Sequence, residues 1–288
     1  MSTTLRAEIG ILGGTGVYGV ESLADAEEIT LDTPFGAPSS PIRIGEMGGR
    51  RVAFLARHGP GHRYLPHEIP YRANVHALKQ LGVEKVLGAS AVGSLREELP
   101  PRTLVVPDQI LDRTRHRADT FFGEGLVAHV SLADPFSEAV RKALLAGARD
   151  AGHAATDGGT YLCMEGPQFS TRAESTFYKG LGCSVIGMTV LTEARLLREA
   201  EIAYASLTMV TDYDAWRTEE EGVEAGDILA VLRANAHVAQ DVLLAALPHV
   251  PEGTLPANRA LDTALVTPLD QVPEATRQRL APILARFG

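Results

Sequence analysis

The chain has 288 residues, of which 45% are hydrophobic and 22% charged, a composition that excludes intrinsic disorder and allows a sizeable core. Its net charge of −9 argues against nucleic acid as the main partner. Two cysteines form no disulfide framework, no apolar run is long enough to span a membrane, and Met1–Glu8 lacks the apolar core of a signal peptide. We therefore expect a cytoplasmic α/β protein with no membrane contact and one domain over residues 1–288.

The first predicted element is Glu8–Tyr18, a short apolar strand followed by a glycine-rich turn. The glycines of Gly13–Gly16 let the backbone approach a ligand, and Thr15 adds a hydroxyl among exposed amides. A dinucleotide-binding site is the competing interpretation. However, the spacing is not GxGxxG, and Thr33–Gly36 forms a turn where a second strand should be. A phosphate-sized anion is the better interpretation.

The segment Arg51–Arg57 predicts a second buried strand, which leads into a loop rich in glycine, proline and histidine. A guanidinium matches phosphate oxygens, so Arg57 and His58 are candidates for a second anion contact. A basic surface loop is the alternative. A helix is expected from about Tyr71 to Gln80, and within it His76 fits a packed position better than a catalytic one.

The middle of the chain alternates strands, turns and helices. Strand Lys85–Ser90 leads into a turn of small residues at Ala91–Leu95, and Asp112–Glu124 is polar and loop-like. None of the nine histidines shows metal-ligand spacing, so we predict no metal. Further strands are expected at Leu104–Val106, Ile110–Leu111, Gly159–Met164 and Val185–Val190, and helices at Ser137–Gly152, Thr192–Ala200, Ala225–Leu247 and Pro273–Phe287.

The segment Ile202–Thr211 is almost wholly apolar or small, which is typical of a strand buried on both faces of a largely parallel sheet. It runs directly into Asp212, Asp214 and two aromatic residues. Ligands of open α/β sheets bind at the carboxyl ends of strands. A helix N-cap followed by a turn is the alternative, but the paired acids and aromatic rings favour a site for a flat nitrogen heterocycle.

Seven motifs follow one another in order: GGTG (13–16), RHG (57–59), HEIPYRANVHALK (67–79), AVGSL (91–95), EGPQFSTRAES (165–175), GMT (187–189) and TDYDAW (211–216). Over residues 8 to 247 they resemble the trimeric purine nucleoside phosphorylase superfamily, and within it the methylthioadenosine phosphorylase family. The resemblance implies an α/β fold with a twisted, mixed, partly barrel-like sheet flanked by helices, assembled as a homotrimer. It also implies reversible phosphorolysis of a purine nucleoside to the free base and a pentose 1-phosphate, with phosphate as co-substrate and no cofactor.

The resemblance assigns residues to both substrates. The implied phosphate contacts are Thr15, Arg57, His58, Ser90, Ala91 and Thr189. The implied nucleoside contacts are His62, Phe169, Ser170, Met188 (through its backbone amide), Ala225, Ile228 and His129, the last at the edge of the neighbouring subunit's site.

The catalytic candidates are Asp212 and Asp214. A leaving purine gathers negative charge, so Asp212 is expected to give a proton to N7 if burial raises its pKa. Asp214 would accept from the exocyclic amine. Two carboxylates suit a 6-aminopurine, because N6 donates where O6 of a 6-oxopurine accepts.

The 5′ end of the nucleoside decides which substrate is preferred. By alignment, Ala225 and Ile228 fall on an apolar face of a helix, and Ala264–Val266 is a candidate to close the same pocket. An apolar pocket favours 5′-methylthioadenosine, which is the predicted substrate. Another 5′-deoxy- or 5′-halo-adenosine, a general purine nucleoside, a hydrolase and a non-catalytic nucleoside binder remain alternatives.

Four departures from the family pattern stand out. They are Gln168 for an arginine, Ser90 for a threonine, Gly187 for an asparagine found in some members, and Leu99–Pro101 for a proline–glycine turn.

Overall fold

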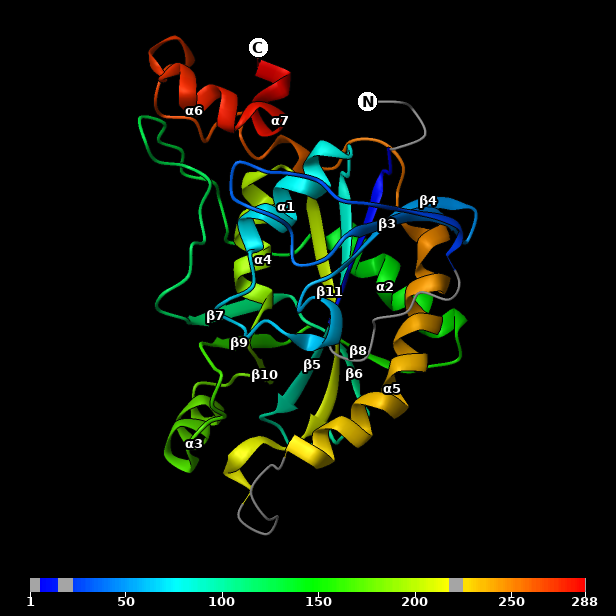
Figure 1. Ribbon diagram of the computed structural model, residues 1–288. Coiled ribbons are helices and arrows are strands. Elements are labelled where there is room, and N and C mark those ends of the chain that lie inside the picture. The colour runs from blue at the N-terminus through cyan, green and yellow to red at the C-terminus, as the bar shows by residue number, and fades with distance from the viewer. Residues whose placement is uncertain (1–5, 15–22, 218–224, 288) are drawn as a thin grey trace.

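The computed structural model describes residues 6–14, 23–217 and 225–287, and for residues 225–234 it describes the backbone. In this part of the chain, eleven strands form one mixed sheet with helices on both sides (Figure 1). The strands are β1 (Ile9–Gly13), β2 (Ala24–Ile29), β3 (Ile42–Met47), β4 (Arg50–Ala56), β5 (Lys85–Ser94), β6 (Leu104–Val106), β7 (Gln109–Arg113), β8 (Ala155–Asp157), β9 (Thr160–Met164), β10 (Val185–Gly187) and β11 (Ala203–Asp212). The helices are α1 (Tyr71–Gln80), α2 (Glu138–Asp150), α3 (Arg172–Gly180), α4 (Val190–Glu199), α5 (Ala225–Ala246), α6 (Glu274–Arg279) and α7 (Ala281–Leu284).

Strand β5 is the branch point of the sheet. The main path runs β2-β3-β4-β1-β5-β10-β9-β7, while β11 pairs with β5 and β6, and β6 pairs with β8. Along β5, residues 85–88 pair with β1, the end of the strand pairs antiparallel with β10, and β11 runs parallel to nearly all of it. The predicted mixed α/β sheet flanked by helices is therefore confirmed.

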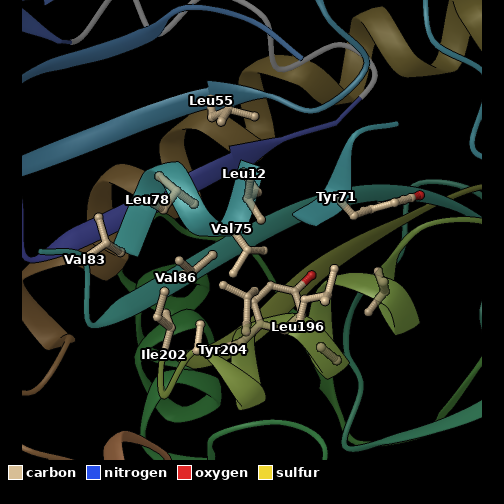
Figure 2. Packing of buried hydrophobic residues seen from close by; sticks show 14 of the residues in the cluster. Leu12, Leu55, Tyr71, Val75, Leu78, Val83, Val86, Leu196, Ile202 and Tyr204 are labelled. Atoms are coloured by element: carbon tan, nitrogen blue, oxygen red, sulfur yellow. The ribbon is translucent and has the colours of Figure 1, made fainter. Parts of the chain in front are cut away.

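The apolar run that forms β11 is explained by two cores, one on each face of the strand. Tyr204 and Val210 pack into the core that also holds α1 and α4, and Figure 2 shows Tyr204 there beside Leu196. Ala205 and Leu207 pack into the core of α2 and α5. Successive side chains of a strand point to opposite faces, so both registers of β11 must be apolar.

Three predicted elements differ from the structure. The strand expected over Val185–Val190 ends at Gly187, and Val190 begins α4. Ala91–Leu95 is not a turn, because β5 continues to Ser94 with hydrogen-bonding partners from both β11 and β10. The helix expected over Pro273–Phe287 is split into α6, α7 and a final 3-10 turn. Its interruption precedes Pro282, which has no N–H to continue the helical hydrogen bonds.

The tail after α5 packs on its own chain. Glu201 accepts hydrogen bonds from the Leu261 backbone at 2.8 Å and from Arg286 at 2.6 Å. Ala128 forms a bridge with Leu265, and the His129 backbone N–H donates to Ala264 at 2.9 Å. Residues 127–129 and 264–266 therefore form one paired strip, in which His129 and Val266 are exposed and Ala264 is buried. Within the described part of the chain, no helix is long and apolar enough to cross a membrane.

Candidate active site

A cavity of about 340 Å³ opens where the ends of β5, β10 and β11 meet the loops after β1, β4 and β9. Its lining combines small residues, which carry hydroxyl groups or present their backbone amides, with large apolar side chains. The lining residues are Gly14, Arg57, His58, His62, Leu65, Pro66, Ser90, Ala91, Val92, Gly93, Met164, Pro167, Phe169, Ile186, Gly187, Met188, Thr189, Thr211, Asp212 and Asp214.

The two aspartates meet in a turn that ends β11. The pairing of β11 with β5 shifts between Val210 and Asp212, and Asp214 takes a left-handed φ of 44° before a short 3-10 turn. One oxygen of Asp212 accepts from the Asp214 backbone N–H at 2.8 Å, and the other accepts from the Thr211 hydroxyl at 2.6 Å. Asp212 thus supports the turn from the position before its N-cap, Tyr213, which makes no side-chain capping bond, and both aspartates line the cavity.

A residue of α3 holds the Asp214 side chain in place. Its side chain is buried, and the hydroxyl of the fully buried Ser175 donates to Oδ2. Burial raises the pKa of Asp214, while hydrogen bonds from Ser175, Ser170 and the backbone of Ala215 act in the opposite direction. A carboxyl group in this setting is suited to a directional hydrogen bond with a donor on a ligand.

At the opposite end of the cavity, the guanidinium of Arg57 is buried, with 1% exposure. Its Nε and Nη2 donate to Glu193 at 2.5 and 3.0 Å, and its other bonds go to the carbonyls of Ala89 and Leu12 at 2.5 and 3.2 Å. The Tyr204 hydroxyl donates to the same glutamate at 2.7 Å. These four bonds use four of the five guanidinium N–H groups. The fifth N–H group belongs to Nη1, which lies against Gly14.

His58 is a neutral side chain beside this charge. Its Nδ1 lies 2.9 Å from the Tyr64 carbonyl, which makes Nδ1 the protonated nitrogen, and its ring stacks on His62 at 4.0 Å. Burial lowers the pKa of His58 to about 3. In the free protein this wall of the cavity therefore carries no histidine charge near neutral pH.

Thr189 stands at the N-terminus of α4. Its hydroxyl is buried, has no hydrogen-bond partner and does not cap the helix. The first backbone N–H groups of a helix favour an anion. The Ser90 hydroxyl, which also lines the cavity, has only a long contact of 3.4 Å to the Ala91 carbonyl. This end of the cavity therefore offers donors that are not committed to the protein.

The structure brings together ten of the fifteen residues predicted for the site. Ser170 lies beside the cavity, 3.8 Å from the sulfur of Met164, whereas His129 is exposed and does not line it. Thr15 and the side chains of Ala225 and Ile228 lie outside the described residues. The ten that line the cavity are Arg57, His58, His62, Ser90, Ala91, Phe169, Met188, Thr189, Asp212 and Asp214. Their individual roles stay predictions.

Three supporting residues were missed by the sequence analysis. Glu193 and Ser175 were not singled out, although each binds a predicted site residue. Arg117 was read only as part of a polar loop, yet it is buried and donates to the Met188 carbonyl at 2.5 Å and to the Glu165 carbonyl at 2.8 Å. A lone charged residue on a predicted helix face or in a loop carries no sequence signal of its burial. Among the described residues, no group of three or more metal-ligating side chains comes together.

Uncommitted donors at one end and a pair of acids at the other, joined by an apolar wall, make a cavity suited to an anion and a heterocycle. The model of the phosphorylase superfamily matches residues 8–248, and the chain belongs to that family. It is 50% identical over 284 residues to an S-methyl-5'-thioadenosine phosphorylase of Koribacter versatilis, covering 98% of this chain and 97% of the relative.

Solved structures agree with this family assignment. A methylthioadenosine phosphorylase from an antarctic soil metagenomic library superimposes with a TM-score of 0.92 at 46% identity, covering 97% of this chain and 99% of the other. A mutant adenosine/methylthioadenosine phosphorylase of Schistosoma mansoni in complex with methylthioadenosine gives 0.84 at 34% identity, covering 92% and 99%.

Proposed function

We propose that the chain catalyses the phosphorolysis of 5′-methylthioadenosine to adenine and 5-methylthioribose 1-phosphate. In this pentosyl transfer, a phosphate oxygen forms a bond to C1′ of the sugar while the C1′–N9 bond breaks and its electron pair passes to the purine. One observation carries the proposal: uncommitted donors and paired aspartates line the two ends of a single cavity. The names of relatives about half identical to this chain support the same reaction.

The phosphate end stabilises the nucleophile. In our proposal Ser90 and Thr189 donate their hydroxyls to phosphate, together with Thr15, the amides at Ala91 and the N-terminus of α4. The remaining Nη1 hydrogen of Arg57 completes the set of donors, and Nε2 of the neutral His58 is an acceptor for a protonated phosphate oxygen. Donors that are already in place lower the barrier because no reorganisation is needed during the reaction, and one such donor contributes about 3–4 kcal/mol.

The purine end receives the leaving group. Asp212 gives a proton to N7, so that the base departs neutral, and Asp214 accepts from the 6-amino group. Ser170 and Phe169 line the base, and the Met188 amide meets the ribose hydroxyls. The apolar wall that includes Leu65 and Ile186 supports a substrate of low polarity. A 5′-methylthio group avoids burying an unpaired hydroxyl, which costs about 1–3 kcal/mol.

Assembly as a homotrimer is part of the proposal. His129 was expected at the edge of a neighbouring subunit's site and Ala264–Val266 at the 5′ end of the nucleoside. The two segments lie in one strip that does not line the cavity of their own chain. We propose that this strip completes the site of a neighbouring subunit. The reaction needs no cofactor and takes place in the cytoplasm, where the two buried thiols stay reduced.

The deciding experiment measures adenine release from 5′-methylthioadenosine with and without inorganic phosphate. We expect adenine to be released only when phosphate is present, in an amount equal to the sugar phosphate formed. A panel containing a 5′-halo-adenosine, adenosine and inosine then ranks kcat/KM, with the methylthio substrate expected to exceed adenosine by up to about a hundredfold. Adenine release without phosphate would indicate a hydrolase, and binding without release would indicate a nucleoside-binding protein.

A further inference from the structure

Arg117 joins two strands at the point where their pairing ends. The parallel ladder of β9 with β10 stops at Cys163 and Gly187. The next residue of each chain is a methionine, Met164 after Cys163 and Met188 after Gly187, and both methionines line the cavity. From there β9 continues into a loop and β10 continues into α4. The ladder itself therefore does not set the spacing of the two methionines.

The guanidinium of Arg117 bonds to both chains at this point. Its Nη1 donates to the Met188 carbonyl at 2.5 Å, and its Nη2 donates to the carbonyls of Met164 and Glu165 at 3.2 and 2.8 Å. The donors of a guanidinium form a rigid planar fork. Bonds from the two ends of this fork to different chains therefore fix the distance between those chains.

The charge of Arg117 is buried, since its side chain is 1% exposed. The Glu165 carboxylate lies 3.6 Å from Nε, but it accepts the backbone N–H of Arg115 at 2.8 Å, and Nε itself has no hydrogen-bond partner. A buried ion adds little to stability compared with an apolar side chain of similar volume. The bonds to main-chain carbonyls thus favour a role in fixing the geometry of the backbone.

The two chains held by Arg117 form the part of the cavity wall assigned to the nucleoside. The loop after β9 contributes Pro167 and Phe169, and the chain after β10 contributes Met188. The loop also packs on this methionine, because a Cβ on Gly166 would lie 2.6 Å from its sulfur. A shift of either chain would therefore move the surfaces that are proposed to contact the base and the ribose.

We propose that Arg117 is a positioning residue for the nucleoside. By fixing the spacing of Met164 and Met188, it holds the surfaces for the base and the ribose at the separation that the substrate needs. Arg117 does not line the cavity, so it acts through the two chains and not on the substrate. The inference rests on the proposed function, because it takes a nucleoside as the ligand of this wall.

The test is Arg117→Lys, which keeps the positive charge but replaces the fork by a single ammonium group. We expect the KM for the nucleoside to rise about tenfold or more, as for lost bonds to a charged group. The KM for phosphate should change much less, because its candidate contacts Ser90 and Arg57 belong to β5 and to the loop after β4.

Arg141→Lys is the matched control. The side chain of Arg141, on α2, is also buried at 8% exposure, and it donates to the carbonyls of Pro107 and Val106 at 3.0 and 3.3 Å. It does not line the cavity. Both substitutions should lower the thermal midpoint, but only Arg117→Lys should change the nucleoside KM.

The two KM values distinguish positioning from a purely structural role. A loss of folded enzyme lowers the apparent kcat and leaves both KM values unchanged, so this result in Arg117→Lys would overturn the proposal. Equal increases in both KM values would overturn the assignment to the nucleoside. Arg117→Gln removes the buried charge and can still donate to one chain, so it provides the same test if the lysine variant does not fold.

Stabilisation by each ligand alone separates this inference from the proposed reaction. In the wild type, 5′-methylthioadenosine and inorganic phosphate should each raise the thermal midpoint. Arg117→Lys should reduce the shift with the nucleoside and keep the shift with phosphate. A wild type that binds both ligands but releases no adenine would refute the reaction and leave Arg117 testable by these shifts. An equal nucleoside shift in the wild type and in Arg117→Lys would overturn the role of Arg117 alone.

Discussion

At the scale of single residues, the site depends on a charge that water does not reach. Arg57 and Glu193 are 1% and 2% exposed. Removing one partner of such a pair leaves an uncompensated charge in a medium of low polarity, whereas removing both is often nearly neutral. Substitutions at Arg57 are therefore expected to change stability as well as the proposed phosphate binding, and the two effects must be separated.

We expect Arg57→Met to lower the free energy of unfolding by about 3–5 kcal/mol, because Glu193 stays buried without its partner. Adding Glu193→Gln should recover a large part of that loss but not the affinity for phosphate. Urea unfolding and phosphate KM measure the two quantities. Arg277→Met serves as the control, since its pair with Glu274 is exposed and is worth less than about 1 kcal/mol. A double variant no more stable than Arg57→Met would contradict this account.

The roles proposed for the paired aspartates predict that a substitution at Asp212 changes the substrate preference. Asp212→Asn keeps a hydrogen-bonding side chain but removes the proton for N7, so turnover of 5′-methylthioadenosine should fall about a hundredfold. Use of 5′-methylthioinosine should fall less, because an amide can donate to a 6-oxopurine. The ratio of the two kcat/KM values is the measurement, with the exposed Asp241→Asn as control. An unchanged ratio would mean that N7 is protonated by another group.

At the scale of elements, α4 serves the site at one end and anchors a loop at the other. Thr189 stands before its first residue. At its last turn, Glu199 accepts from the Phe121 backbone at 2.6 Å and from the Thr120 hydroxyl at 2.8 Å. The same loop carries Arg117, which donates to the carbonyl of Met188. A single helix thus connects the loop of residues 117–121 to the phosphate end.

The buried carboxyl of Glu199 makes stability depend on pH. Its pKa is raised by burial from 4.5 to about 7, so between these values the folded state binds a proton that the unfolded state has released. This contribution is fully present below pH 4.5 and is lost as pH rises through 7, a change on the order of 3 kcal/mol.

Glu199→Gln should remove this dependence. Relative to the wild type, its free energy of unfolding should rise between pH 5 and pH 8, as followed by urea unfolding at several pH values. The exposed Glu252→Gln is the matched control and should follow the wild type. A Glu199→Gln variant whose difference from the wild type does not vary with pH would show that Glu199 does not titrate in this range.

Local patterns predicted eight of the eleven described strands, but not β2, β3 or β8, and not the partners of the site residues. Strands such as β11 carry a local apolar pattern that predicts them directly. The pairing of Arg57 with Glu193 joins residues 136 positions apart, and no local pattern indicates which buried acid meets which base. The extension of β5 was missed for a related reason, because its hydrogen-bonding partners come from β10 and β11.

At the scale of the whole molecule, the position of His129 is the main evidence on assembly. It shares a strip with Ala264–Val266, outside the cavity of its own chain. Phe177 and Leu181, at α3, are 56% and 48% exposed. Large apolar side chains at a surface are common at protein contacts, and closed symmetric assemblies use the same patch in every copy.

Shared sites can be detected by mixing subunits. His129→Ala and Asp212→Asn should each be poorly active alone, because each damages every site. In the proposed homotrimer, coexpression of the two variants should produce intact sites, about a quarter of the total for random mixing around a closed ring, and activity should rise accordingly. A mixture with only the mean activity of the two variants, or an active monomer by mass measurement in solution, would rule out sites completed across an interface.

The long pairing of β5 with β11 also has a consequence for the exchange of backbone hydrogens with solvent. Ser90 on β5 and Asp212 on β11 belong to one ladder that is buried for almost its whole length. Amides of such a ladder exchange only when the whole domain opens. Deuterium uptake should therefore be slowest in peptides from these two strands. The distance between the two substrates would then persist as long as the fold itself does, with no hinge to adjust it.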